Sequence, residues 1–386
     1  MTDPLAERRR ILDEAMRTRG AWPQDAPWVR DAFDALPRHA FAPDRLWDWD
    51  GTGYVPVDRG AAPTRWVELV YAGPDNAAVT EVTDGIPSSS LSAPAVVATM
   101  LDSLDVEPGH RVLELGTGTG WNAALIAHRV GASGRVTSVE ASPELADAAA
   151  GRLECAGVRV DVVVGDGNLG RPATAPYDRV IAAYAVDRVP WAWIDQTAPG
   201  GDLVFPLGRM GHFAVTIADD HRSARGWMHG LAQFMNARDT PAPAATVRSY
   251  TQVRAGRPPD DKRAVDRDIT PLHTDVNLLW ALRMALPDVV YTTDTDRDGV
   301  NAWIHDGTSS WAVVTTGPDG GARTEQGGPR RLFDALETAW DAWTAHGGIS
   351  RWDHGVTLTE HEQYVWEGDP DTGRRFHLPG PVSAHA

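Results

Sequence analysis

The sequence predicts an α/β fold: a parallel sheet with helices on both faces, followed by a smaller α+β domain. Three observations lead to this prediction. An apolar strand at 112–115 enters a glycine-rich turn and then an apolar helix. Further strand and helix patterns alternate up to about residue 217, which is typical of a doubly wound sheet. After a Pro/Ala-rich stretch at 240–245, a second set of apolar segments begins.

Taken in order, the elements form four segments. Residues 1–85 are expected to form a helical and loop extension, with amphipathic helices at 5–19 and 28–36. Residues 86–238 form the predicted core, with a closing hairpin made by strands near 213–217 and 231–235. A linker at 239–247 precedes an α+β domain at 248–386, whose tryptophans indicate a folded region and which we expect to bind a peptide substrate.

The turn at 116–120 has the composition of a nucleoside-cofactor site. Gly116, Gly118 and Gly120 allow a tight backbone path close to a ligand, and the next helix offers its N-terminal amides. The following strand ends in Glu140, an acid placed to hydrogen-bond ribose hydroxyls. A third strand leads to Asp166, whose carboxylate could hold an adenine amino group. These features predict a bound nucleoside.

Two details favour S-adenosyl-L-methionine over a dinucleotide or a nucleoside triphosphate. A phosphate-binding loop would place Lys-Ser/Thr after the last glycine, whereas Trp121-Asn122 follow here. Glu114 also suits a cationic amino-acid group better than a phosphate. The predicted cofactor-binding residues are Ser89, Glu114, Gly116, Thr117, Gly118, Gly120, Trp121, Glu140, Ala141, Asp166 and Gly167.

A serine-rich stretch lies just before a helix that is expected to start near Pro94. Ser88, Ser89, Ser90 and Ser92 occur within five residues. One serine could cap the helix while the others form a polar loop. Alternatively, the hydroxyls bind an anion near the helix N-terminus, where the helix dipole favours negative charge. Both interpretations remain open from the residues alone.

Composition narrows the possible functions. The net charge of −17 argues against a nucleic-acid substrate, because such binding relies on a basic surface. No apolar run is long enough for a membrane span, and no signal-peptide pattern is present, so we expect a cytoplasmic protein. Cys155 is the single cysteine and the histidines show no ligand spacing, so no metal site is expected. His39 is interpreted as a packing residue. The oligomeric state stays open.

Several motifs between about residues 29 and 235 together resemble those of the protein-L-isoaspartyl (D-aspartyl) O-methyltransferases. That family's PRHxFxP motif matches residues 37–43, and its VLEIGTGSGY motif matches 112–121. Its APYD and IDQLxPGGxLVxPxG motifs match 175–178 and 194–208. The family's TIS-x-P motif matches 90–94, so the resemblance implies that Ser92 is the active-site serine. It also implies a Rossmann-like class I S-adenosylmethionine-dependent methyltransferase fold.

Two departures from the family bear on the substrate. Ser88-Ser89-Ser90 replace the family's Gly-Gln-Thr, and about 150 residues follow the methyltransferase domain. The combination is similar to methyltransferases of bacterial ribosomal-peptide maturation, for graspetides, lanthipeptides or lasso peptides. Such enzymes methylate an aspartate of a modified precursor peptide, and the ester closes to an aspartimide. The alternatives are repair of isoaspartyl proteins and a non-catalytic cofactor-binding scaffold.

The implied chemistry assigns roles to two serines. A carboxylate is ionised at pH 7, so its methylation needs alignment more than a strong base. We expect Ser92 to hydrogen-bond the substrate carboxylate and Ser90 to help orient it. A hydroxyl suits this role better than Arg or Lys, which would over-stabilise the charged ground state. An Asn/Asp-Pro-Pro-Tyr/Phe motif of nucleic-acid methyltransferases is absent at 182–185.

Overall fold

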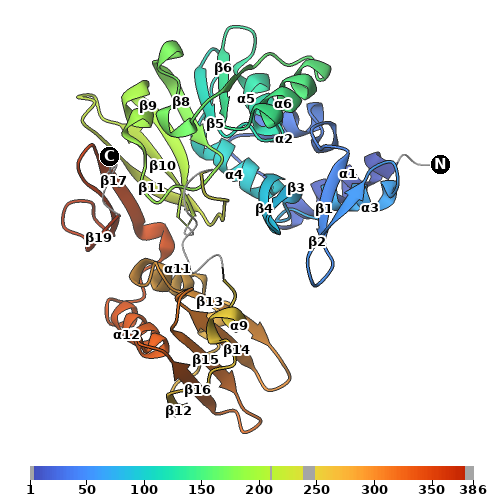
Figure 1. The fold of residues 1–386 in the computed structure, drawn as a ribbon. Coiled ribbons are helices and arrows are strands. Elements are labelled where there is room, and N and C mark those ends of the chain that lie inside the picture. Colours follow the sequence, from blue (N-terminus) through green and yellow to red (C-terminus); the bar gives the residue numbers. More distant parts are fainter. Residues whose placement is uncertain (1–3, 209–210, 238–247, 379–386) are drawn as a thin grey trace, which may run out of the picture. The chain divides into compact units, whose positions relative to one another are not determined.

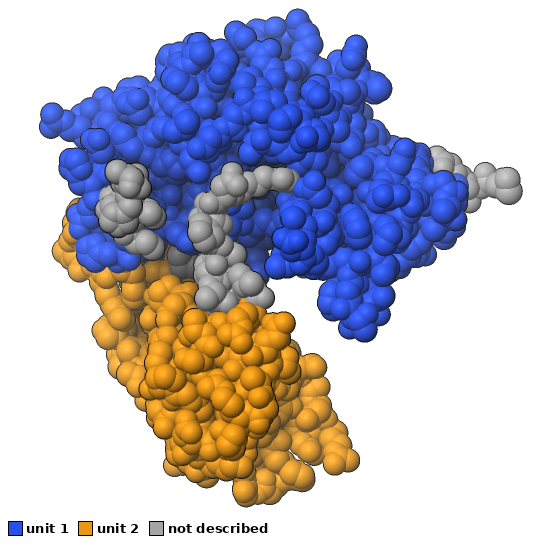
Figure 2. All heavy atoms as spheres, in the orientation of Figure 1, with its two compact units in different colours: residues 1–238, 355–365, 377–386 blue, residues 239–354, 366–376 orange. Residues whose placement is uncertain are grey.

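The computed structural model describes residues 4–208, 211–237 and 248–378. The chain forms two compact units, which Figure 2 distinguishes by colour. The first comprises residues 1–238, 355–365 and 377–386, and the second comprises residues 239–354 and 366–376. The predicted linker at 239–247 lies outside the described residues. Each unit has its own hydrophobic core.

A parallel sheet forms the centre of the first unit and confirms the predicted α/β fold (Figure 1). Its strands lie side by side in the order β9-β8-β5-β6-β7, and all four pairings between them are parallel. Apolar residues dominate these strands because both faces are buried. The strands are β5 (Arg111–Leu115), β6 (Arg135–Glu140), β7 (Asp161–Val164), β8 (Tyr177–Ala182) and β9 (Thr197–Leu207). The accompanying helices are α4 (Pro94–Leu104), α5 (Trp121–Val130), α6 (Pro143–Cys155) and α7 (Trp191–Gln196), with short η2 (Gly167–Leu169) and η3 (Pro172–Thr174).

Antiparallel strands extend this sheet beyond β9, and they correct two predictions. The hairpin partner of β10 (Gly211–Ile217) is β11 (Ser223–Gly230), and residues 231–235 form no strand. The hairpin closes sooner than predicted because a tight turn at 218–222 follows β10 directly, with His221 at a φ of +58°. Next to β11 come β17 (His354–Thr359), β18 (Gln363–Glu367) and β19 (Arg375–His377).

Residues 248–386 therefore do not form a single C-terminal domain, because part of this segment completes the first unit. β17 pairs with β11 over five residue pairs, from Ser223 with Thr359 to Trp227 with Gly355. Gln363 adds a second attachment: its amide accepts a hydrogen bond from Val189 N at 2.9 Å and donates one to Val189 O at 2.7 Å. The physical reason is that β11 would otherwise be an unpaired sheet edge.

A small antiparallel sheet lies in the N-terminal part, where only helices and loops were predicted. Its order is β2-β1-β3-β4, formed by β1 (Arg45–Trp49), β2 (Tyr54–Asp58), β3 (Ala78–Thr83) and β4 (Ile86–Leu91). The two-residue turn between β3 and β4 is Asp84-Gly85, with φ values of +52° and +78°. Asp-Gly is a strong hairpin signal because it tolerates positive φ. The predicted boundary at residues 85 and 86 thus cuts a hairpin, and the serines lie largely on a strand.

Four helical segments cover this region and contribute to one continuous core. They are α1 (Pro4–Thr18), α2 (Trp28–Ala35), η1 (Arg38–Ala40) and α3 (Pro63–Val70). The first two agree with the predicted helices to within one residue at each end. Met16, Phe33, Trp66 and Trp121 are among the buried side chains of the core.

The second unit contains a five-stranded antiparallel sheet with the order β12-β16-β15-β14-β13. Helices α11 and α12 pack against the sheet through a core that includes Leu282, Ile304, Val314 and Leu336. The strands are β12 (Asp261–Val265), β13 (Val290–Thr295), β14 (Val300–His305), β15 (Trp311–Thr316) and β16 (Ala322–Gly327). The helices are α9 (Tyr250–Arg254), α10 (Pro271–Thr274), α11 (Val276–Ala285) and α12 (Leu332–Ala345), with η4 (Arg351–Asp353).

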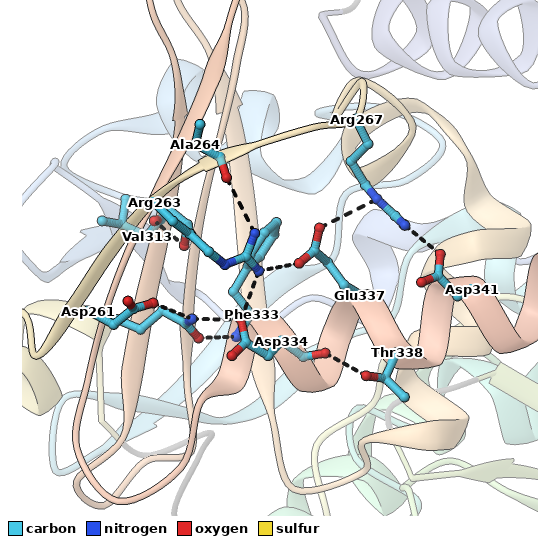
Figure 3. A network of polar contacts seen from close by, with 12 residues as sticks. Asp261, Arg263, Ala264, Arg267, Val313, Phe333, Asp334, Glu337, Thr338 and Asp341 are labelled. Carbon is cyan, nitrogen blue, oxygen red and sulfur yellow. Dashed lines mark hydrogen bonds and ion pairs between the residues drawn. The ribbon is translucent and has the colours of Figure 1, made fainter.

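A polar network ties β12 and β16 to α12 in this unit (Figure 3). Arg263 donates to Asp334 at 2.8 Å and also pairs with Glu337. Gln326, which is fully buried, donates to Asp334 at 2.8 Å and accepts from the Phe333 amide at 2.8 Å. Because each buried polar group has a partner, the network orients the helix without leaving a polar group unpaired.

Candidate active site

The glycine turn follows β5, the central strand of the parallel part of the sheet. Gly116, Gly118 and Gly120 have φ values of +93°, +54° and +87°, a region that residues with a Cβ rarely adopt. At Gly120, which precedes α5, a Cβ would also lie 3.3 Å from that of Ala149 on α6. The predicted tight turn is therefore present at the carboxyl end of the sheet, where ligands bind in open α/β folds.

Glu140 links this turn to the end of the neighbouring strand β6. Its two carboxylate oxygens accept hydrogen bonds from Gly118 N at 2.9 Å and from Ser142 N at 3.1 Å. The side chain is only 5% exposed. Each carboxylate oxygen can accept more than one hydrogen bond, so capacity for ribose hydroxyls remains. Ala141, the next predicted residue, is exposed at the same edge.

Glu114 lies on β5, two residues before Gly116, and its side chain is fully buried. Its carboxyl oxygens accept hydrogen bonds from Asn122 Nδ2 at 2.8 Å and from the Ser138 hydroxyl. Ser138 is also 2.6 Å from the Thr117 hydroxyl. The side chain of Glu114 is 0% exposed and so offers no surface to a ligand; the prediction that it directly holds the cationic part of the cofactor therefore needs revision. Through Ser138, Glu114 is linked to Thr117 of the turn, so these side chains stabilise the turn from within the protein.

Burial raises the pKa of Glu114 from its usual 4.5 to about 7, and the hydrogen bonds from Ser138 and Asn122 oppose the rise only in part. Because the folded pKa lies above the unfolded one, the contribution of Glu114 to the free energy of unfolding is fully present below about pH 4.5 and is lost as the pH rises through about 7. The shift corresponds to roughly 3 kcal/mol.

Glu114→Gln is expected to remove most of this pH dependence, because the amide resembles the neutral acid. Urea unfolding of wild type and variant at pH 5 and pH 8 would measure it. The wild type should lose more stability than the variant between the two pH values. Equal losses in both proteins would contradict a raised pKa in the folded state.

Asp166 and Gly167 follow β7 at the same edge of the sheet. Asp166 is exposed, and its carboxylate accepts a hydrogen bond from Asn168 N at 2.8 Å. A residue that the sequence analysis missed, Tyr184, lies between this turn and the glycine turn. A Cβ at Gly167 would be 2.5 Å from the Tyr184 hydroxyl, and a Cβ at Gly116 would be 3.1 Å from its ring. Tyr184 follows β8. Because ligands bind at the carboxyl ends of parallel strands, this position could have indicated that the tyrosine lies near the site.

Trp121, predicted as a cofactor contact, instead lies in the core. Its indole is 2% exposed and donates to Leu36 O at 2.9 Å. Its ring packs edge-on against Phe33 with centroids 4.7 Å apart. The prediction was wrong because Trp121 is the first residue of α5. Being next to a glycine in the sequence does not determine which way a helical side chain points.

The serine stretch lies close to the glycine turn. The carbonyl of Ser90 lies 4.0 Å from the position of a Cβ on Gly118, so the end of β4 and the turn are neighbours. Ser88 donates to Glu81 at 2.9 Å. The side chain of Ser89 is buried on the same face of β4 as that of Leu91. Little of the Ser89 side chain is therefore open to a cofactor. Ser92 is half-buried between β4 and α4.

Helix capping does not account for the serines. The residue before α4 is Ala93, and no side chain caps this helix. Within the described ranges, the hydroxyl groups of Ser90 and Ser92 form no hydrogen bond with the protein, whereas Arg38 donates to the carbonyl of Ser92. His39, predicted to be a packing residue, lies 2.7 Å from the Tyr71 hydroxyl through Nδ1.

The part of the chain that the structure describes contains neither a candidate metal site nor a candidate membrane-spanning helix. Those residues contain no group of three or more His, Cys, Asp or Glu side chains that could hold a metal ion. They also contain no helix that is both long and apolar enough to cross a membrane. The groups near the glycine turn are instead those expected around a nucleoside: backbone amides, a buried carboxylate and an exposed one. They fit S-adenosyl-L-methionine.

Comparison with known proteins agrees with this chemistry. Residues 66–230 match the family model for protein-L-isoaspartate(D-aspartate) O-methyltransferase. The protein-L-isoaspartate O-methyltransferase 1 of Archaeoglobus fulgidus is 34% identical over 232 residues, which cover 59% of this chain and 92% of the relative. The enzyme of Aeropyrum pernix is 36% identical over 223 residues, covering 56% and 73%. A solved protein-L-isoaspartate O-methyltransferase, 21% identical with a TM-score of 0.47, aligns with 91% of this chain and 96% of its own.

The matched region contains β4, Ser92, the glycine turn and Glu140, so the comparison covers the whole candidate site. The chain belongs to the protein-L-isoaspartate(D-aspartate) O-methyltransferase family and is a carboxyl O-methyltransferase that uses S-adenosyl-L-methionine.

Proposed function

We propose that the enzyme methylates the free carboxylate of an isoaspartyl residue in a peptide or protein. The observation that carries this proposal is the approach of two segments: Ser90 O lies 4.0 Å from the Cβ position of Gly118. This approach brings a pair of serines beside the turn that fits the cofactor. The relatives named for this activity support the proposal. From the sequence alone, a modified precursor peptide is the first choice of substrate and an isoaspartyl protein the second; this proposal reverses that order.

Ser92 is proposed to donate its hydroxyl hydrogen to the substrate carboxylate, with Ser90 helping to orient it. S-adenosyl-L-methionine, when bound, supplies the methyl group. Methyl transfer then forms a bond between the carboxylate oxygen and the methyl carbon, while the methyl–sulfur bond breaks and its electron pair stays on sulfur. Alignment of this kind can contribute roughly 7–11 kcal/mol. Arg38, which binds the carbonyl of Ser92, directs its donors to backbone carbonyls, so it does not neutralise the nucleophile.

The methyl ester is then a substrate for ring closure. The following backbone nitrogen attacks the ester carbonyl carbon, loses its proton and expels methanol, which leaves a succinimide. Hydrolysis of the succinimide can regenerate a normal aspartyl bond. No additional residue of the enzyme is required for the closure, because it is intramolecular.

A second candidate is methylation of an ordinary aspartate in a modified ribosomal precursor peptide. Two features of the chain favour this candidate. Ser88-Ser89-Ser90 form part of the edge strand β4 beside the site, which changes the surface offered to a substrate backbone. The second unit is also a folded α+β domain and is proposed to bind a constrained peptide.

Mass spectrometry with two substrates in parallel separates the candidates. One is a short isoaspartyl peptide, and the other is a precursor peptide encoded near the gene, already cyclised. A gain of one methyl group on the isoaspartyl peptide, followed by loss of methanol, is expected. Modification of the cyclised peptide alone would support the second candidate and refute the first. The matching aspartyl peptide is the control and should gain nothing.

The contribution of the second unit needs a test other than truncation. Ending the chain after residue 245 would also remove β17, so that β11 would keep its pairing with β10 but expose its other edge. Loss of activity in such a fragment would therefore not reveal a substrate-binding role. Substitutions on the surface of the second unit, with S-adenosyl-homocysteine affinity as the control, avoid this ambiguity.

A further inference from the structure

Arg38 is a buried cation that the proposed chemistry does not use directly. It begins η1 and is only 2% exposed. Its guanidinium donates to Val70 O at 2.9 Å, to Leu91 O at 2.8 Å and to the carbonyl of Ser92, and more weakly to Asn76 O at 3.4 Å. One side chain thus joins the end of α3, the segment that precedes β3 and the segment between β4 and α4.

The energetics of this arrangement call for an explanation. No carboxylate lies within ion-pair distance of Arg38 in the ranges that the structure describes. Burial lowers its pKa to about 9, yet the group remains charged at neutral pH. A buried charge without a counter-ion is costly unless hydrogen bonds replace its hydration, and four carbonyls do so here.

A purely structural role would be to cap α3, since Val70 is the last residue of that helix. Capping explains one of the hydrogen bonds but not those to Leu91 and Ser92. The guanidinium also lies 5.1 Å from the ring centroid of Trp121, the first residue after the glycine turn. Arg38 therefore contacts both the serine segment and the start of the helix that follows the glycine turn.

We infer that Arg38 is a positioning residue that holds the backbone of Leu91-Ser92 in register with the glycine turn, and so sets the Ser92 hydroxyl against the substrate carboxylate. The inference rests on the proposed function of Ser92. Backbone carbonyls are suitable attachment points because they fix the segment without occupying the serine hydroxyls. The planar fork of arginine can reach several carbonyls at once, which the single ammonium of lysine cannot.

The test compares Arg38→Met and Arg38→Lys with a matched control, Arg129→Met. Like Arg38, Arg129 donates to a backbone carbonyl (Val106 O, 2.8 Å) and lies over a tryptophan ring (Trp28, 5.4 Å), but it is half-buried and lies at the other end of α5. The readouts are kcat and KM for the isoaspartyl peptide, affinity for S-adenosyl-homocysteine, and hydrogen–deuterium exchange over 88–95 and 111–121.

Arg38→Met is expected to lower kcat about a hundredfold, because displacement of a reacting group by about 1 Å has an effect of this size. Exchange over 88–95 should rise, whereas exchange over 111–121 and S-adenosyl-homocysteine affinity should stay within threefold of wild type. Arg38→Lys should fall in between, and Arg129→Met should change none of these. Wild-type kcat, or unchanged exchange over 88–95, in Arg38→Met would overturn the inference.

Arg38→Ala with added guanidinium keeps the test valid if the methionine variant does not fold. A small cavity of about 40 Å³ adjoins the residue, lined in part by Pro37, Tyr71 and Trp121, and offers a path for the ion. Recovery of protection over 88–95 with guanidinium, but not with ammonium, is expected; no recovery would overturn the inference. Because exchange needs no substrate, it remains decisive even if the enzyme proves not to methylate isoaspartyl peptides.

Discussion

Replacing Ser92 with alanine is expected to lower kcat for carboxylate methylation roughly ten- to hundredfold while affinity for S-adenosyl-homocysteine stays unchanged. A hydrogen bond to a charged group is worth about 1.5–3 kcal/mol, and the proposed arrangement loses one. The backbone should stay in place in the variant, because Arg38 binds the carbonyl of Ser92 and not its hydroxyl.

Single-turnover kinetics with the isoaspartyl peptide would measure this loss, and calorimetry would measure the cofactor affinity. Ser88→Ala is the matched control: it lies in the same stretch, but its hydroxyl donates to Glu81. The control should keep kcat within about threefold of wild type. Full activity in the Ser92 variant would remove the proposed role of this residue.

Glu140→Gln is expected to weaken binding of S-adenosyl-homocysteine about a hundredfold. The carboxylate accepts hydrogen bonds from the amides of Gly118 and Ser142. In the variant an NH2 group faces one of these donors, so a charge-assisted hydrogen bond is lost and two donors oppose each other. A loss of about 3 kcal/mol corresponds to roughly a hundredfold in affinity.

Glu144→Gln is the control for this effect, because Glu144 is an exposed acid four residues away on α6. Calorimetric titration of both variants gives the comparison. Affinity within threefold of wild type in the control is expected. Equal weakening in both variants would indicate a general electrostatic effect and contradict the specific role of Glu140.

Features with a local cause could be predicted from the sequence. The turn at 116–120 requires positive φ at three positions, and only glycine adopts such values without strain. The end of β6 is marked by its apolar run, so Glu140 could be placed beside the turn. Helices α1 and α2 were recognisable because their apolar residues repeat at helical spacing.

Features that depend on distant partners could not be predicted in the same way. Trp121 is adjacent to the turn in the chain, yet its ring faces Phe33 and Leu36. Glu114 was placed correctly on β5, but its burial follows from Asn122 and Ser138, which close over it. Asp84-Gly85, just before the serine stretch, is a local hairpin signal, but the pairing of β4 with β3 places the serines on an edge strand.

The sequence by itself determined the α/β class, the cofactor turn with Glu140, and the family, because each depends on short segments whose residues restrict their own backbone or match known motifs. Only the tertiary structure decided that β17 and β18 extend the sheet of the first unit. It likewise decided that Tyr184 lies between Gly116 and Gly167, and that Arg38 joins the serine segment to Trp121. These arrangements bring together residues tens to more than a hundred positions apart. Their stability comes from burial and hydrogen bonds that exist only once the chain has folded.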